Sequence, residues 1–282
     1  MTFHNPTASL FIPDGESPDA ALSRVTHLGV GAHQDDLEFM AYHGIEACYR
    51  RPERWFGGVT CTNGSGSART GLYADYSDEE MCAVRRKEQD QAAVVGEYAA
   101  MIQLDYPSSV IKDPANPAPV EDLGAVLRAT APEVVYTHNL ADKHATHIAV
   151  TANLLKAVRS LPAAERPAKV LGCEVWRGLD WMLDDEKTVL DVSRRPNLSA
   201  AVGGLFDSQI AGGKRYDLAV EGRRLANATF FESHAVDAAG QVWFAMDLTP
   251  LVEDETLDPA DYAAGFIQRF EESVRAALKG YF

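Results

Sequence analysis

Short apolar runs alternate with amphipathic stretches along the first 180 residues of the chain. The apolar runs predict strands over residues 25–32, 55–62, 102–104, 134–137 and 170–176. The amphipathic stretches predict helices over residues 37–50, 77–97, 120–131 and 146–160. Ser77 and Glu80 fit a capping box at the start of the second helix. This alternation is typical of an α/β fold, so we expect a Rossmann-like, mainly parallel sheet flanked by helices.

The pattern changes at both ends of the chain. Residues 1–24 carry three prolines and several turn formers, which predict an irregular N-terminal arm. Residues 199–227 have a helical pattern, and residues 229–248 predict two strands joined around Asp237–Gly240. Asp258 and Pro259 then begin a last amphipathic helix through Leu278. We expect one domain over residues 25–282, with a motif-bearing core at 25–160 and a C-terminal α+β elaboration from about residue 199.

Composition excludes several classes of partner. The 282 residues include 41 acids and 26 bases, for a net charge of −15. This balance repels phosphate backbones and anionic lipid, so we expect neither nucleic acid nor membrane as a partner. The four cysteines lack C-x-x-C spacing, which favours reduced thiols over a disulfide framework. Residues 1–20 do not resemble a signal peptide and no apolar stretch reaches about 18 residues, so we expect a cytoplasmic protein.

Two clusters of metal-binding residue types follow predicted strands. Ala32–Glu38, with the sequence AHQDDLE, follows the first strand. Its adjacent acids repel each other unless a cation or hydrogen bonds compensate, although acids also suit a helix N-terminus or a solvated loop. The second cluster, THNLADKHATH over 137–147, follows the strand VVYT. Imidazole and carboxylate are good zinc ligands, and two such clusters at strand ends favour a metal site.

These clusters resemble the motifs of the LmbE-like, or PIG-L, zinc-dependent N-acetylglucosaminyl deacetylases. AHQDDLE resembles the A-H-x-D-D-x-E motif, and DKHATH resembles the H-x-D-H motif. Thr62–Gly64 and Arg85–Glu88 resemble the T-x-G loop and the R-x-x-E helix of the family, and Phe206–Gln209 faintly resembles a later S-Q element. The resemblance covers about residues 25–160.

The resemblance implies a role for each matching residue. His33, Asp36 and His147 would hold one Zn²⁺ per chain. Asp35 would be the general base, and His144 would stabilise the tetrahedral intermediate. Arg85 would contact the substrate sugar, although as one half of an Arg85–Glu88 surface pair it would have no such role. His138, at the end of its strand, suits a structural role as well as a functional one.

The chain departs from the family pattern at Thr146, which replaces the aspartate of H-x-D-H. In the family this acid is thought to orient the neighbouring histidine. Asp142, which we count with Arg85 among the substrate-binding residues, could supply the missing carboxylate to His144. Gln34 replaces a common proline, which should matter little.

The predicted function is a zinc-dependent hydrolase that removes acetyl from an N-acetylated sugar or glycoside. Zinc lowers the pKa of a bound water to about 7, and Asp35 would take the water's proton. Two alternatives stay open: a metal-dependent phosphoesterase, which would need two metals, and a non-catalytic sugar-binding protein, which Thr146 favours. Homo-oligomers occur among family members, so a homo-oligomer is possible, and the sequence leaves the oligomeric state open.

Overall fold

The computed structural model describes residues 1–282, and its centre is an eight-stranded sheet with the order β1-β4-β3-β2-β5-β6-β8-β7. The strands are β1 (Ser9–Phe11), β2 (His27–Gly31), β3 (Phe56–Thr62), β4 (Ala100–Tyr106), β5 (Val134–His138), β6 (Lys169–Cys173), β7 (Thr188–Asp191) and β8 (Val242–Asp247). The helices are α1 (Pro18–Ser23), α2 (Asp36–Met40), α3 (Tyr42–Cys48), α4 (Asp78–Val95), α5 (Ser108–Ile111), α6 (Ala118–Thr130), α7 (Ala145–Arg159), α8 (Pro196–Gly203), α9 (Asp207–Ile210), α10 (Tyr216–Phe230), α11 (Thr249–Glu253) and α12 (Pro259–Leu278). Three short 3-10 turns lie at Gly71–Tyr73, Ala163–Glu165 and Asp184–Glu186. The predicted α/β class is confirmed.

The five central strands, β4, β3, β2, β5 and β6, are all parallel. The chain runs outward from β2 through β3 to β4, and then returns to the other side of β2 to form β5 and β6. The direction of winding therefore reverses between β2 and β5. In open α/β sheets, ligands bind at the carboxyl ends of the strands beside such a switch point.

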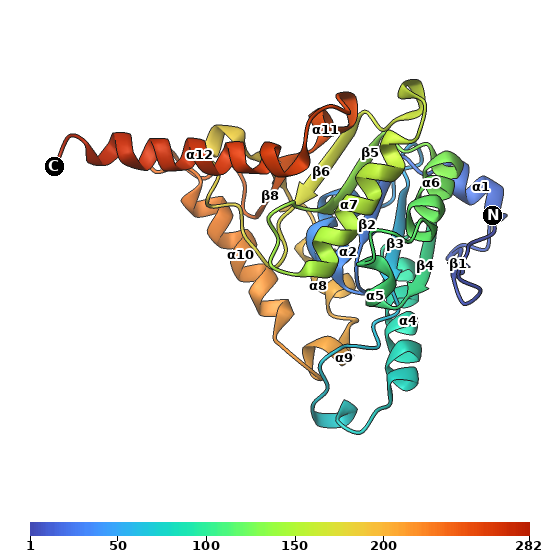
Figure 1. The fold of residues 1–282 in the computed structure, drawn as a ribbon. Coiled ribbons are helices and arrows are strands. Elements are labelled where there is room, and N and C mark those ends of the chain that lie inside the picture. The colour runs from blue at the N-terminus through green and yellow to red at the C-terminus, as the bar shows by residue number, and fades with distance from the viewer.

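Helices cover both faces of the sheet (Figure 1). One apolar cluster of 34 buried residues joins the sheet to α1, α6, α7 and α11. A second cluster of 19 buried residues joins the other face to α2, α3, α4 and α8. Gly31 lets α2 pack directly on the end of β2, because a Cβ there would lie 3.0 Å from the Cβ of Asp36. The site loop that contains Asp36 therefore sits tightly on the sheet.

The predicted helix over residues 37–50 is divided into α2 and α3 at Ala41. The capping box that begins α4 is confirmed: Ser77 Oγ accepts from the backbone N–H of Glu80, and the Glu80 carboxylate accepts from that of Ser77. The N-terminal arm is not irregular, which corrects the prediction. β1 pairs antiparallel with β4, and Ser17 caps α1 with Pro18 in its first turn. The three residues of β1 are too few for an alternating pattern to be visible in the sequence.

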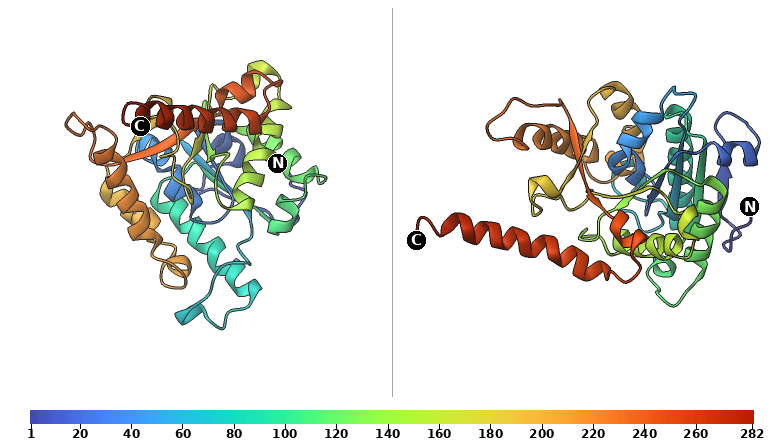
Figure 2. Two further views of the ribbon diagram at one scale, coloured as in Figure 1. Left: turned by 60° about the vertical axis from the view of Figure 1, so that its left-hand side comes forward. Right: turned by 90° about the horizontal axis from the view of Figure 1, so that it is seen from above.

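The prediction of two strands over residues 229–248 is wrong. Thr229 and Phe230 continue α10, and only Val242–Asp247 forms a strand. β8 needs no hairpin partner, because it pairs antiparallel with β6 on one side and with β7 on the other. The strand β7 was not predicted. In the views of Figure 2, α10 packs beside β8 while α12 extends away from the sheet to the C-terminus.

The helix α12 has the predicted bounds, and the Asp258 side chain caps it by accepting from the N–H groups of Ala260 and Asp261. The part beyond Phe266 is largely exposed. No helix combines the length and apolar character that crossing a membrane would require.

Candidate metal centre and its pocket

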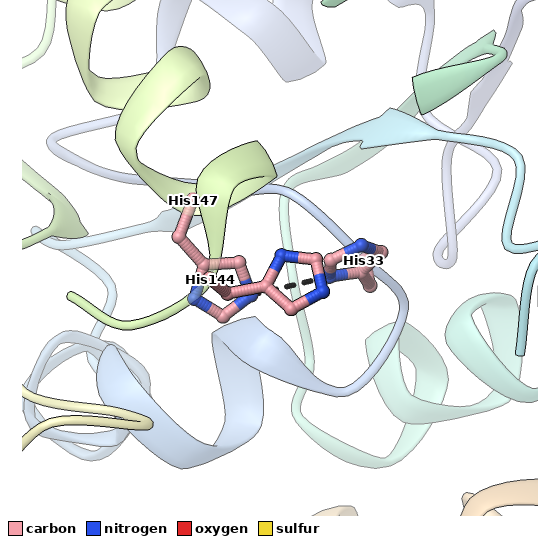
Figure 3. A group of neighbouring side chains, drawn as sticks. All are labelled: His33, His144 and His147. Carbon is pink, nitrogen blue, oxygen red and sulfur yellow. Dashed lines mark hydrogen bonds between the residues drawn. The ribbon is translucent and has the colours of Figure 1, made fainter. Parts of the chain in front are cut away.

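The two predicted clusters meet at the carboxyl ends of β2 and β5. His33 and Asp36 lie on the loop after β2 and in the first turn of α2, while His144 and His147 lie at the start of α7. Figure 3 shows the rings of His33, His144 and His147 gathered at this point. His33 and His147 are 114 residues apart in the sequence. Their side chains are nevertheless in direct contact, because they follow the neighbouring parallel strands β2 and β5.

The residues predicted to bind metal present their ligand atoms to one another. His147 Nε2 lies 3.2 Å from His33 Nδ1 and 3.5 Å from Asp36 Oδ1. His33 Nδ1 lies 3.3 Å from Asp36 Oδ2. Ligand bonds of about 2.0–2.1 Å in tetrahedral geometry put ligand atoms about 3.3 Å apart. The three distances are close to this value, with Asp36 approaching His147 through Oδ1 and His33 through Oδ2.

Asp36 is held as an anion within this group. Its Oδ2 accepts from the backbone N–H groups of Ala32 and His33, at 3.1 and 2.7 Å. Burial would raise the pKa of Asp36, but His147 and His138 lower that pKa well below its ordinary value. Asp36 in turn, with Asp142, raises the pKa of His147 against the opposing effect of burial. Negative charge is thus concentrated beside the imidazoles, as a cation site requires.

His138, for which the sequence allows either a structural or a functional role, lies within the centre. Its ring stacks on that of His147 with centroids 3.8 Å apart, and its Nε2 lies 3.4 Å from Asp36 Oδ2. That nitrogen accepts from the N–H of Ala32 at 3.0 Å, and the side chain is fully buried. His33, by contrast, is partly exposed to the pocket. His138 therefore supports the ring of His147 and Asp36 from behind.

Asp35 lies beside Asp36 with a backbone φ of 104°, a strained value for a residue with a side chain. Its N–H donates to Gln89 Oε1 at 3.3 Å, and its carboxylate lines the pocket. Burial raises the pKa of Asp35 well above its ordinary value, while Arg85 opposes this effect. The strained loop turns Asp35 toward the pocket while Asp36 faces the histidines.

The structure places Asp142 behind the centre and not in the pocket. Its fully buried carboxylate has Oδ1 3.4 Å from His147 Nδ1 and accepts from the backbone N–H groups of His144 and Trp176. Asp142 does not line the pocket, so its predicted contact with substrate is not found. The carboxylate of Asp142 lies beside the ring of His147, whereas it accepts only from the backbone N–H of His144.

His144 faces the pocket together with Thr146. Its ring meets that of His33 edge-on at 4.9 Å, and its buried Nδ1 has no hydrogen-bond partner. Burial and the neighbouring His147 lower the pKa of His144. Thr146, which stands in place of the aspartate of the motif that DKHATH resembles, is uncharged.

Arg85 is buried beneath the pocket, so the alternative of an exposed pair with Glu88 is wrong. Its Nη1 donates to Ser67 Oγ at 2.5 Å, its Nη2 donates to the carbonyl of Gln34, and Nη2 lies 3.6 Å from Asp35 Oδ1. Gly64, at φ 74°, packs so closely that a Cβ would lie 2.6 Å from Arg85 Cδ. The guanidinium thus ties the 62–67 loop to Asp35.

Glu88 faces the other way and joins α4 to α9. Its carboxylate accepts from the backbone N–H of Ser208 at 2.8 Å and from Ser208 Oγ at 2.6 Å. The segment around Ser208, which only faintly resembles the S-Q element of the family, is therefore bound to α4, the helix that carries Arg85. Glu38 is also a supporting residue, because it is buried and accepts from Gln89 and Tyr98.

A cavity of about 570 Å³ opens above the centre. Its floor contains His33, Asp35 and Asp36. The residues of its outer wall include Trp176, which follows β6, and Lys214 and Tyr216, which lie at the start of α10. The size lies in the range of small-molecule sites. The C-terminal third, which carried no motif, therefore forms one wall of the pocket.

A protein-family model described as PIG-L, GlcNAc-PI de-N-acetylase, matches residues 28–158. No curated protein sequence matches the chain. Among solved structures, 4-carboxy-2-hydroxymuconate hydratase from Pseudomonas putida is 18% identical, with a TM-score of 0.61 over 79% of this chain and 96% of its own. N,N'-diacetylchitobiose deacetylase from Pyrococcus horikoshii is 15% identical, with a TM-score of 0.56 over 82% and 88%. The A40926 pseudoaglycone deacetylase Dbv21 is 15% identical, with a TM-score of 0.57 over 79% and 97%.

At these identities the solved structures show a shared fold. The family match is more specific, because residues 28–158 include β2, β5 and both of the clusters that follow them. Residues 28–158, slightly less than half of the chain, therefore resemble the PIG-L, or LmbE-like, family.

Proposed function

We propose that this protein is a zinc-dependent N-deacetylase that hydrolyses the acetamide of an N-acetylglucosamine-type sugar or glycoside. The observation that carries the proposal is the mutual approach of His33, Asp36 and His147 to within 3.2–3.5 Å, at a point where His33 and Asp36 line a cavity and His147 lies buried next to them. The family match and the fold shared with two solved deacetylases support the same reaction.

The donor set fits zinc. Two imidazole nitrogens and one carboxylate are ligands that catalytic zinc sites use, and the side of the group that faces the cavity leaves room for water and substrate. A bound zinc would supply a water of lowered pKa and a Lewis acid at the floor of the cavity. His138 and Asp142 would keep the ligand rings in place from behind.

Asp35 is proposed as the general base. It takes a proton from the attacking water, whose oxygen bonds to the acetyl carbonyl carbon, and it then returns the proton to the amine nitrogen as the C–N bond breaks. The products are acetate and the free amine. His144, whose ring meets that of His33 edge-on, is proposed to donate to the oxyanion of the tetrahedral intermediate. Arg85 favours the ionised form of Asp35 and holds the 62–67 loop in place. Arg85 is therefore proposed as a positioning residue.

Phosphoester hydrolysis is the second candidate, and metal stoichiometry distinguishes it from deacetylation. The two groups of side chains that could each hold an ion, His33–His144–His147 and Asp36–His138–His147, both contain His147. Two-metal phosphoesterases need two sites about 3.5–4 Å apart, so the number of ions bound per chain separates the two reactions.

The experiment is acetate release from a panel of N-acetylated glycosides, measured after chelation and again after zinc is restored. We expect release from at least one member, loss of release on chelation, and recovery at one zinc per chain. A protein that releases no acetate from any member at any metal loading is not a deacetylase of this class. Turnover that requires two ions per chain would favour the phosphoesterase, and a hydratase would act without releasing acetate.

A further inference from the structure

The charge of the pocket is opposite to that of the whole chain. Only two of the 41 acids line it, Asp35 and Asp36, and both belong to the floor. Five of the 26 bases line it: Arg85, Lys112, Lys214, Arg215 and Arg223. The outer wall therefore carries cations and no acid, in a protein with a net charge of −15.

Three of these cations have no carboxylate partner. Arg85 pairs with Asp35, and Arg215 pairs with Asp217. Lys112, Lys214 and Arg223 form no ion pair, although acids outnumber bases in the chain. We call these three residues the cationic rim. Cations left without carboxylates around one cavity are placed to meet an anion from outside the chain.

Aromatic rings and a carbonyl hold two members of the rim. Lys214 Nζ lies 4.6 Å from the centre of the Trp176 ring, and Trp176 meets Tyr216 edge-on at 5.9 Å. Arg223 is half-buried on α10, donates to the carbonyl of Val175, and has its guanidinium carbon 5.7 Å from the centre of the Trp243 ring. These contacts position the cations without neutralising them.

The rim lines the same cavity of about 570 Å³ as His33 and Asp36, two of the three proposed metal ligands. Lys112 directly follows α5, whereas Lys214 and Arg223 belong to the segment around α10. A substrate with its acetamide at the floor therefore extends between cations contributed by two separate parts of the chain.

We propose that the cationic rim binds a carboxylate or phosphate of the substrate, so that the preferred substrate is an N-acetylated glycoside with an anionic aglycone. The inference rests on the proposed function for the acetamide end only. The anion accepts from Lys214 and Arg223, and Trp176 lies beside the aglycone. Hydrogen bonds to charged groups of this kind change affinity by about 10- to 100-fold.

The test uses three matched glycosides of N-acetylglucosamine, whose aglycones are glycerol, glycerate and glycerol phosphate. With the zinc-loaded protein, we expect kcat/KM for at least one anionic glycoside to exceed that for the neutral glycoside by about tenfold or more. The excess should shrink at high ionic strength. A preference for glycerate assigns a carboxylate to the rim, and a preference for glycerol phosphate assigns a phosphate.

Two variants locate the preference. Lys214→Gln alters an exposed side chain, and with Arg223→Gln it should bring the ratio of anionic to neutral kcat/KM close to one. Arg177→Gln is the matched control, because Arg177 is exposed next to Trp176 but does not line the pocket. It should keep the wild-type ratio. Equal ratios in the wild-type protein and in the Lys214→Gln variant would overturn the proposal.

Calorimetric binding of the same glycosides separates this inference from the proposed function. If no acetate is released but the anionic glycosides still bind more tightly, and Lys214→Gln removes that difference, the deacetylase assignment fails and the cationic rim stands. If acetate is released and all three glycosides bind and react alike, the deacetylase assignment stands and the rim proposal is wrong.

Discussion

Asp142 Oδ1 lies 3.4 Å from Nδ1 of His147, so this buried carboxylate orients the ring whose Nε2 faces His33 and Asp36. Loss of a carboxylate behind a metal-binding histidine commonly weakens metal affinity by about 10- to 100-fold. We therefore expect Asp142→Asn to lower zinc affinity by that factor in a competition titration against a chelator. Asp180→Asn, at an exposed acid, is the control and should bind zinc as the wild type does. Unchanged affinity in Asp142→Asn would remove Asp142 from the centre.

A methyl group at position 64 should disturb the site through Arg85. Gly64 has φ 74°, and its added Cβ would lie 2.6 Å from Arg85 Cδ. Gly64→Ala should lower the free energy of unfolding by about 1–3 kcal/mol and reduce acetate release. Gly66→Ala is the matched control on the same loop, because a Cβ there meets nothing within 4 Å. Similar stability and activity in the two variants would show that the loop does not position Arg85.

The bond between Ser208 and Glu88 should contribute measurably to stability. Ser208 is fully buried and donates to the Glu88 carboxylate through both its N–H and its Oγ. Ser208→Ala leaves a half-buried carboxylate with one donor fewer, so we expect a loss of about 1–3 kcal/mol in urea unfolding. Ser23→Ala, at an exposed helix end, should change stability by less than about 0.5 kcal/mol. Equal effects would mean that the contact between α4 and α9 is weak.

His43 should make the folded state less stable in mild acid. Burial lowers the pKa of His43 from 6.5 to about 4, and its Nδ1 lies 2.9 Å from the Tyr136 hydroxyl oxygen. The unfolded chain therefore binds this proton first as pH falls, so the stability contribution is complete above about pH 6.5 and is lost toward pH 4.

The matched measurement is the free energy of unfolding of wild-type protein and His43→Gln at pH 7 and pH 4.5. The wild type should lose more stability between these values, by about 2 kcal/mol, because the variant has no proton to bind at this position. The difference between the two proteins isolates His43, since the other titrating groups are common to both. Equal losses would show that His43 titrates normally in the folded protein.

Much of the floor of the pocket could be predicted from local sequence. AHQDDLE and DKHATH each combine several metal-binding residue types within seven residues, and each follows an apolar strand. Parallel strands bring their carboxyl ends to one edge of the sheet, so the proximity of the two clusters follows from the fold class. The fold class does not predict the direction in which each side chain points. Asp142 was placed toward the substrate, but the loop before α7 turns it toward His147.

The outer wall could not be predicted in the same way. Lys214 and Arg223 belong to a segment about 70 residues beyond the second cluster, and nothing local to it indicates which side of α10 faces the pocket. The strand β8 was mistaken for half of a hairpin because its partners, β6 and β7, are distant in sequence. The sequence does not decide the role of His138, because a histidine at a strand end has the same local pattern in a structural role and in a functional one. These features depend on tertiary packing.

The most direct test of the account compares acetate release by zinc-loaded wild-type protein and Asp35→Asn, with the zinc content of both proteins measured. Asparagine keeps the size of the side chain but cannot take the water's proton. We predict that the wild type releases acetate, that Asp35→Asn is slower by about 10²- to 10⁴-fold, and that both retain one zinc per chain. Equal rates in the two zinc-loaded proteins, or no acetate from the wild type on any N-acetylated glycoside, would contradict the account.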